Sequence, residues 1–147
     1  MRVAITKLNI ARELLDRGLR LYYQGDSYFS SLHLAGAAEE ILGEYLRRSG
    51  LTSNFQAWRT SGVDLLNAMS DGGAAWTSDE MGKAMNYAKN RTKHLDQSES
   101  DVVSFDPEVE ATELLERAVS DYYQLMSVHD LPETELISRF NQRPSRA

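Results

Sequence analysis

Apolar residues recur along most of the chain at intervals of three and four, the spacing that places side chains on one side of an α-helix. The longest apolar-rich segment covers residues 30–46. Its apolar side chains form two lines on a helix surface: Leu34, Ala38, Ile41 and Tyr45 on one, and Leu32, Ala35, Leu42 and Leu46 on the other. A helix that is apolar over so much of its surface packs on several neighbours, so we expect residues 30–46 to form the central helix.

The same segment contains three residues that an ordinary core helix does not need. Gly36 and Gly43 lie seven residues apart on one line, where a neighbouring helix can approach closely. Each glycine costs a helix interior up to about 1 kcal/mol relative to alanine. Glu39 points to the same side, and a carboxylate there must be paired, capped or protonated. We expect Glu39 either to face a cation from a neighbouring helix, or to cap a helix or reach solvent at the bundle edge.

Five other segments have helical spacing, and capping signals mark several of their ends. They cover residues 6–24, 55–69, 77–95, 106–129 and 133–141. Thr77 and Glu80 form a capping-box sequence, and Pro107 follows Asp106 at the position where proline opens a helix. No segment has the alternation typical of a strand. The pattern predicts an all-α, up-and-down antiparallel bundle of about five helices plus a short C-terminal helix.

The composition is that of one soluble globular domain. Of the 147 residues, 41% are hydrophobic and 26% are charged. We expect a single domain over residues 1–141 and a flexible tail at 142–147. No apolar run reaches the length of a membrane span, and the N-terminus lacks the features of a signal peptide, so we expect a cytoplasmic protein without membrane contact. The net charge of −6 argues against strong non-specific binding of nucleic acids.

Metal, thiol and cofactor chemistry have little support in the sequence. The chain has no cysteine, and therefore no disulfide or thiolate ligand. None of His33, His94 and His129 follows a glutamate at the Glu-x-x-His spacing of di-iron bundles. No zinc signature and no glycine-rich phosphate loop occurs. We therefore expect neither a metal site nor a cofactor.

The most informative stretch is residues 87–94, where three cations and a histidine gather in an acidic chain: Lys89, Arg91, Lys93 and His94. Such groups are favourable at a helix C-terminus, so one interpretation is helix capping on a solvated face. The other interpretation is a site. Asn90 and His94 are four residues apart on one predicted face, with Tyr87 and Lys83 below them. This group could position a phosphate, or activate a 2′-hydroxyl by general-base catalysis beside a cation.

Three stretches resemble the HEPN superfamily (higher eukaryotes and prokaryotes nucleotide-binding). They are LYYQGD at residues 21–26, AGAAEEILG at residues 35–43, and Lys89-Asn90 followed by His94. The resemblance implies a small helical bundle of a bacterial defence or toxin–antitoxin type. Many members carry an arginine, a polar residue that is often asparagine, and a histidine four to six positions after the arginine. That motif implies RNA cleavage without a metal, in a cleft shared by the two subunits of a homodimer.

Carried over to this chain, the resemblance makes His94 the candidate base and makes Asn90 and Lys89 the candidate phosphate-binding groups. Lys89 stands where the family has arginine, and Arg91 is too close to His94 to be the motif arginine. The candidate supporting residues are Glu39, Arg91 and Tyr87. If the central helix packs against residues 77–95, Glu39 is expected to reach Lys89 or Arg91 and to hold it in place.

Three functions stay open from the sequence. The first is a metal-independent ribonuclease, or an RNA- or nucleotide-binding protein. The second is a non-catalytic dimerisation or interaction module, because lysine is a point charge that cannot reproduce the two-pronged grip of arginine on phosphate. The third is a helical bundle that binds a small ligand in a pocket near Glu39 and Trp58. The expected partners are a second copy of the chain and either RNA or another protein.

Overall fold

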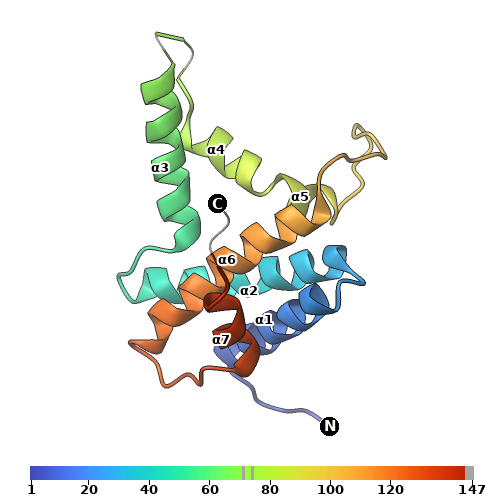
Figure 1. Cartoon of the computed structure of the whole chain (residues 1–147), viewed down its shortest axis with the longest axis vertical. Helices are drawn as coiled ribbons and strands as arrows, with labels where there is room; N and C mark the ends of the chain where they lie inside the picture. The colour runs from blue at the N-terminus through green and yellow to red at the C-terminus, as the bar shows by residue number, and fades with distance from the viewer. Residues whose placement is uncertain (71, 74, 145–147) are drawn as a thin grey trace.

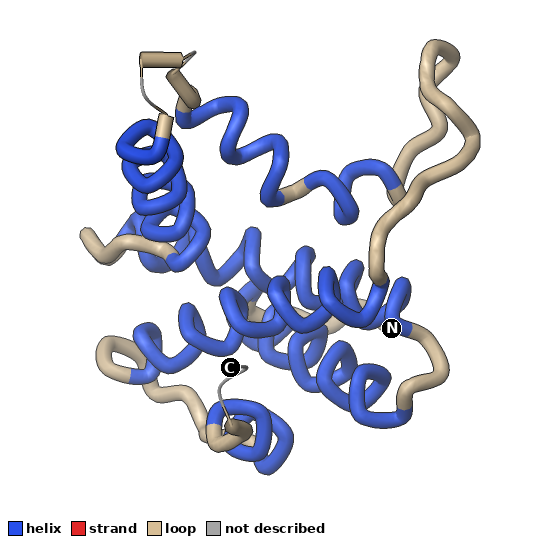
Figure 2. Tube along the Cα trace, turned by 45° about the horizontal axis from the view of Figure 1, so that its top comes forward, coloured by secondary structure: helices blue, strands red, loops and turns tan. Residues whose placement is uncertain are grey.

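The computed structural model describes residues 1–70, 72–73 and 75–144, and every regular element in these ranges is an α-helix (Figure 1, Figure 2). The helices are α1 (Lys7–Gln24), α2 (Tyr28–Arg48), α3 (Asn54–Met69), α4 (Ser78–Met85), α5 (Tyr87–Arg91), α6 (Pro107–Met126) and α7 (Glu135–Asn141). The all-α prediction is confirmed. Among the described helices, none combines the length and the apolar content needed to traverse a lipid bilayer.

The hydrophobic core lies between α1, α2 and α6, and α7 covers one side of it (Figure 2). α2 contacts both α1 and α6 along its length, and its inward-facing side chains are fully buried: Leu32, Ala35, Ala38, Leu42 and Leu46. Full burial of each leucine contributes about 2 kcal/mol. The prediction that residues 30–46 form the central helix is confirmed.

α1 and α2 lie close together at Gly18. The hydroxyl of the buried Ser31 donates a 2.8 Å hydrogen bond to the backbone carbonyl of Gly18. A Cβ atom at Gly18 would lie 3.3 Å from the carbonyl oxygen of Ser31 and 3.4 Å from the backbone nitrogen of Ala35. Both neighbours belong to the backbone of α2, which cannot move aside as a flexible side chain can. The contact between the two helices therefore depends on glycine at this position.

Capping residues mark the helix starts where the sequence predicts them. Thr77 and Glu80 make both hydrogen bonds of a capping box at the start of α4, at 2.9 and 3.1 Å. Asp106 Oδ1 accepts from two backbone N–H groups of the first turn of α6, and Pro107 opens that helix. These local signals are confirmed because a cap needs only its own neighbours in the chain.

The predicted helix at residues 77–95 is in fact two short helices that meet at Asn86. The Oδ1 atom of Asn86 accepts a 3.3 Å hydrogen bond from Arg117 of α6. Beyond Asn86, α5 turns Ala88 and Lys89 inward, so that both are buried, and α5 contacts α2. The break thus accompanies contacts with α2 and α6, which no periodicity within residues 77–95 encodes.

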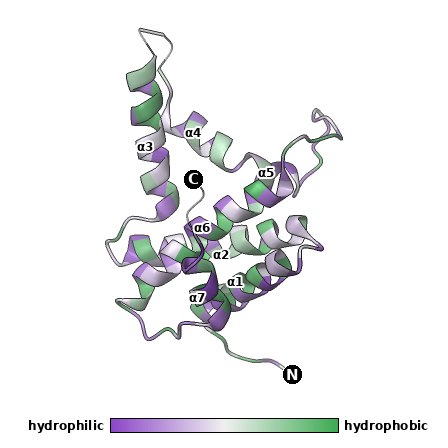
Figure 3. Cartoon of the chain, in the orientation of Figure 1, coloured by the Kyte–Doolittle hydropathy of each residue, from purple (hydrophilic) through white to green (hydrophobic). Residues whose placement is uncertain are grey.

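α3 and α4 form an arm that stands away from the core (Figure 1). α3 packs on α4 and on one part of α6, and none of its residues is buried. Figure 3 shows hydrophobic positions along α3 in spite of this exposure. Within the described ranges the helices therefore pack as a core of α1, α2, α6 and α7 with an attached arm.

The C-terminal segment is held to the core as far as the structure describes it. Ile137 and Phe140 of α7 are fully buried. Arg143 lies in the predicted tail, but its guanidinium stacks on the Phe140 ring at 3.7 Å and also pairs with Glu116. Residues 145–147 of that tail lie outside the described residues.

Alanine substitution at two helical glycines is expected to have opposite effects on stability. At Gly43 the added Cβ meets only Ser53 Cβ at 3.6 Å, so Gly43→Ala should raise the free energy of unfolding by up to about 1 kcal/mol. Gly18→Ala should lower it by about 1 kcal/mol, because overpacking against the α2 backbone outweighs the gain in helix propensity. Denaturant unfolding measures both, and equal stabilisation by the two changes would contradict the close contact at Gly18.

Candidate functional site

The structure separates the residues of the predicted Lys89–Asn90–His94 site. α5 ends at Arg91, and the hydroxyl of Thr92 bonds back to the carbonyl of Ala88 at 2.7 Å. His94 therefore follows the helix and does not share a helical face with Asn90. Both side chains are exposed to solvent. The prediction that they lie above one another on one helix is wrong.

The candidate residues Tyr87 and Arg91 lie on the exposed side of α5 and contact each other. Tyr87 is exposed, and the guanidinium of Arg91 lies 5.6 Å from its ring centroid. Arg91 pairs with Glu99 of the following loop at 2.9 Å. Lys83, on α4, pairs with Asp79 at 2.9 Å. These contacts belong to the outer surface of α4, α5 and the loop after them.

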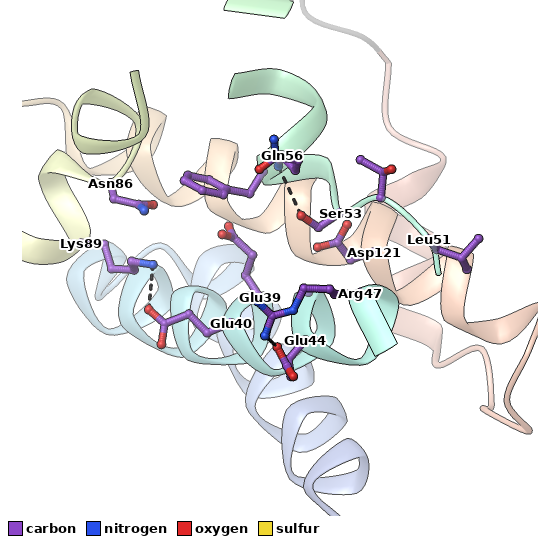
Figure 4. A pocket seen from close by; sticks show the side chains of 13 residues that line it. Glu39, Glu40, Glu44, Arg47, Leu51, Ser53, Gln56, Asn86, Lys89 and Asp121 are labelled. Carbon is purple, nitrogen blue, oxygen red and sulfur yellow. Dashed lines mark hydrogen bonds and ion pairs between the residues drawn. The ribbon is translucent and has the colours of Figure 1, made fainter. Parts of the chain in front are cut away.

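Lys89 points the other way, into the molecule (Figure 4). Its side chain is buried against α2, and its Nζ atom pairs with Glu40 Oε1 at 2.9 Å. Its aliphatic stem lies on Gly36, where a Cβ atom would come within 2.5 Å of Lys89 Cδ. Gly36 therefore allows α5 to approach α2, as expected, and the side chain that lies against it is that of Lys89. Burial raises the pKa of the Glu40 carboxyl, but the hydrogen bond and charge of Lys89 outweigh burial and lower it overall.

Glu39 pairs with Arg117 of α6 rather than with Lys89 or Arg91. The Nε atom of Arg117 lies 2.8 Å from Glu39 Oε2, and the two side chains are 2% and 5% exposed. The expectation of a cation beside Glu39 is confirmed, but its source is α6 and not the helix that contains Lys89. Burial raises the pKa of the Glu39 carboxyl, while the charges of Arg117 and Lys89 act in the opposite direction.

Charged side chains from three helices line a cavity of about 470 Å³, which lies between α2, α5, α6 and the first turn of α3 (Figure 4). The charged residues of its wall are Glu39, Glu40, Glu44, Arg47, Lys89 and Asp121. Glu44, on the outer side, pairs with Arg48 at 2.9 Å and also with Arg47. Figure 4 shows Glu39 directed toward the interior, with Lys89 and Asp121 to either side of it. The cavity brings together Glu39 and Lys89 of the predicted set and leaves out Asn90, Arg91 and His94.

Asp121 is the least satisfied group of this wall. It is 0% exposed, and its Oδ1 accepts hydrogen bonds from the backbone N–H and the side-chain amide of Asn54, at 2.7 and 2.9 Å. Its Oδ2 is buried and has no hydrogen-bond partner in the described part of the chain. Burial raises the pKa of the Asp121 carboxyl, and the Asn54 bonds and the charge of Arg117 oppose this only in part.

Arg117 and Asp121 are site residues that the sequence reasoning missed. They lie four residues apart on α6, on a helical line that begins at Leu114 and ends at Leu125. Both leucines are buried, and so are the two charged residues between them. The sequence does contain a signal for this site: Arg117 and Asp121 interrupt an apolar line of the helix. Charged residues at such positions are buried only when they have partners, so they mark a polar site in the interior.

The three histidines lie apart from the cavity wall. His33 Nε2 and the Thr92 hydroxyl are 2.7 Å apart, and burial followed by the charge of Lys93 lowers the pKa of His33. The His129 ring packs edge-on against Tyr45 with 5.7 Å between centroids. Within residues 1–70, 72–73 and 75–144, no group of three or more His, Asp or Glu side chains is placed to hold a metal ion.

Comparisons with known proteins do not add a family to this geometry. No protein-family model, no curated protein and no solved structure matches the chain. The arguments for function therefore rest on the residues themselves.

Asp121→Asn is expected to stabilise the protein at high pH and to have little effect at low pH. Asparagine keeps an oxygen for the two Asn54 bonds and removes the buried charge. Because the folded-state pKa of Asp121 is raised, its ionisation destabilises the fold. This destabilisation is absent below the unfolded-state pKa, about 4, and grows as pH rises through the folded-state pKa.

At pH 8 the substitution should raise the free energy of unfolding by about 1 kcal/mol, which corresponds to about 2–4 °C in Tm. Thermal unfolding of wild type and variant at about five pH values between 4 and 8 measures the difference in the free energy of unfolding. A gain that is the same at every pH would contradict the buried, ionised Asp121.

Proposed function

We propose that the protein is a HEPN-like helical binding module without catalytic activity, and that it acts as a homodimer. The observation that carries the first part is the position of Lys89. A lysine that replaces the family's arginine must offer its ammonium to a phosphate, but this ammonium is buried beside Glu40 at 2.9 Å. To reach a phosphate, Lys89 would have to leave the place beside Gly36 where its stem is buried and give up its hydrogen bond to Glu40.

The arm of α3 and α4 supports the homodimer. Trp58, Leu65 and Met69 recur at intervals of seven and four, so they share one face of α3. Leu65 is 60% exposed and Met69 is 71% exposed, although both are large apolar side chains. A contiguous apolar face on the surface of a protein is typical of an interaction site.

The charge distribution favours a second copy of the chain as the partner of this face. α3 itself contains one cation and one carboxylate, Arg59 and Asp64, whereas the whole chain has a net charge of −6. Two copies therefore repel each other only weakly where their α3 helices meet. A symmetric dimer would place the same apolar face on both sides of the contact.

Leu65→Glu is expected to convert the dimer into a monomer. In a two-fold symmetric contact the substitution buries two carboxylates, so the dissociation constant should rise by about 100-fold or more. Sedimentation equilibrium at micromolar concentration measures this change. Leu95→Glu is the matched control, since Leu95 is another exposed leucine, on the loop after α5, and its replacement should leave the dimer intact. A wild-type monomer, or equal effects of the two changes, would contradict the arm as the interface.

The second candidate function is the metal-independent ribonuclease that the resemblance implies. One observation favours it: Arg91, Lys93 and His94 are all exposed where α5 ends, so they are accessible to RNA. This cluster is separate from Lys89, which faces the interior. A ribonuclease at this cluster would use His94 as the base and Lys93 as the phosphate-binding cation, because Arg91 is paired with Glu99.

Incubation of the purified dimer with end-labelled RNA in EDTA distinguishes the two functions. We expect the RNA to stay intact, because the proposed module lacks an assembled catalytic group. Cleavage that His94→Ala reduces by about 100-fold or more would establish the ribonuclease in its place. His129→Ala serves as the control, because His129 packs against Tyr45 away from the basic cluster.

A further inference from the structure

Asp121 differs from the other carboxylates that line the cavity. Glu39 pairs with Arg117, Glu40 with Lys89, and Glu44 with Arg47 and Arg48. No cation in the described ranges lies within ion-pair distance of Asp121, whose carboxylate is 0% exposed. Its two hydrogen bonds both go to Oδ1, so Oδ2 remains an unused acceptor in the cavity wall.

A buried polar atom without a partner is rare, because the folded protein loses the hydrogen bonds that water would supply. No neighbouring donor in the described part of the chain binds Asp121 Oδ2. The amide of Asn54 is already directed to Oδ1, and Arg117 is bound to Glu39 and Asn86. Because Asp121 lines the cavity, its unused acceptor is the group of the wall that a bound hydrogen-bond donor would satisfy.

The cavity has the size and the lining of a small-molecule site. Its volume of about 470 Å³ falls within the range of ligand pockets, about 300–1,000 Å³. Phe55 and Leu51 contribute apolar surface. Three of the four carboxylates in the wall are paired with cations, and among the described residues Asp121 has no such partner. The unpaired charge of the lining is therefore negative, and it favours a cation over an anion.

We propose that the cavity binds a compact organic cation, an alkylammonium group, which donates a charge-assisted hydrogen bond to Asp121 Oδ2. The carbon chain of the ligand lies toward Leu51 and Phe55, and the ammonium occupies the interior end beside Asp121. A hard metal ion fits less well, because it needs several oxygen ligands and Asp121 has one free oxygen. This site is separate from the exposed face of α3 that carries Leu65 and Met69, and from the basic cluster after α5.

Titration with n-butylamine tests the proposal, with 1-butanol and butyrate as neutral and anionic probes of the same length. The readout is the ¹⁵N–¹H spectrum, in which the side-chain amide of Asn54 reports directly on Asp121. We expect n-butylamine to shift the Asn54 and Phe55 signals with a dissociation constant of about 10 mM or lower, and we expect neither other probe to do so. Equal shifts with butanol, or no saturable shift with butylamine, would overturn the proposal.

Asp121→Asn separates binding from folding. The variant should bind n-butylamine at least about tenfold more weakly, as expected when a charge-assisted hydrogen bond is lost. Thermal unfolding establishes that the variant is folded, since the removal of a buried charge should stabilise it. Glu113→Gln is the control: Glu113 is an exposed carboxylate on α6 that does not line the cavity, so its loss should change the affinity by less than about twofold. If Asp121→Asn bound n-butylamine with wild-type affinity, Asp121 Oδ2 would not be the acceptor of the ligand, and the cation site would be refuted.

Discussion

The buried guanidinium of Arg117 joins more elements of this fold than its position within α6 suggests. Its Nε atom binds Glu39 of α2 at 2.8 Å, and its Nη2 atom binds Asn86 between α4 and α5 at 3.3 Å. It also lies 5.3 Å from the ring centroid of Phe55 in the first turn of α3. One side chain thus contacts the central helix, the arm and the break that redirects α5. A pair of apolar residues could join α2 to α6 as strongly, but it could not also donate a hydrogen bond to Asn86 at the break between α4 and α5.

The cavity is a consequence of this arrangement. Glu39, Arg117 and Asp121 are buried where α2 and α6 meet the first turn of α3, at positions that apolar side chains would otherwise fill. Gly43 lines the cavity without a side chain, and the stem of Lys89 occupies the space beside Gly36. What remains is a hollow with a charged wall (Figure 4). Such a hollow is costly to keep in a domain of this size, and a ligand that neutralises Asp121 would reduce the cost.

The helices could be predicted from the sequence because their signals are local. The Thr77 capping box, Pro107 after Asp106 and the two apolar lines of α2 each involve residues within a few positions of one another. The break at Asn86 could not be predicted in this way, because its partner Arg117 is 31 residues away in the chain. The same limit applies to Glu39: its environment demanded a cation, but Arg117 is 78 residues away. The apolar residues on α3 predict that this helix packs against another surface, but the pattern is the same whether that surface belongs to this chain or to a partner.

The first turn of α3 connects the two surfaces to which we assign binding. Asn54 donates its backbone N–H and its side-chain amide to Asp121, so this turn is held in place by the same carboxylate that lines the cavity. Phe55, the next residue, stacks on Arg117 and also lines the cavity. The rest of α3 carries the exposed face with Leu65 and Met69. The charge at Asp121 therefore bears on the attachment of the arm, because a carboxylate accepts these two N–H bonds more strongly than a neutral acid does. Asp121 therefore links three properties: the stability of the fold, the cavity to which we assign a cation, and the attachment of the arm to which we assign the dimer contact.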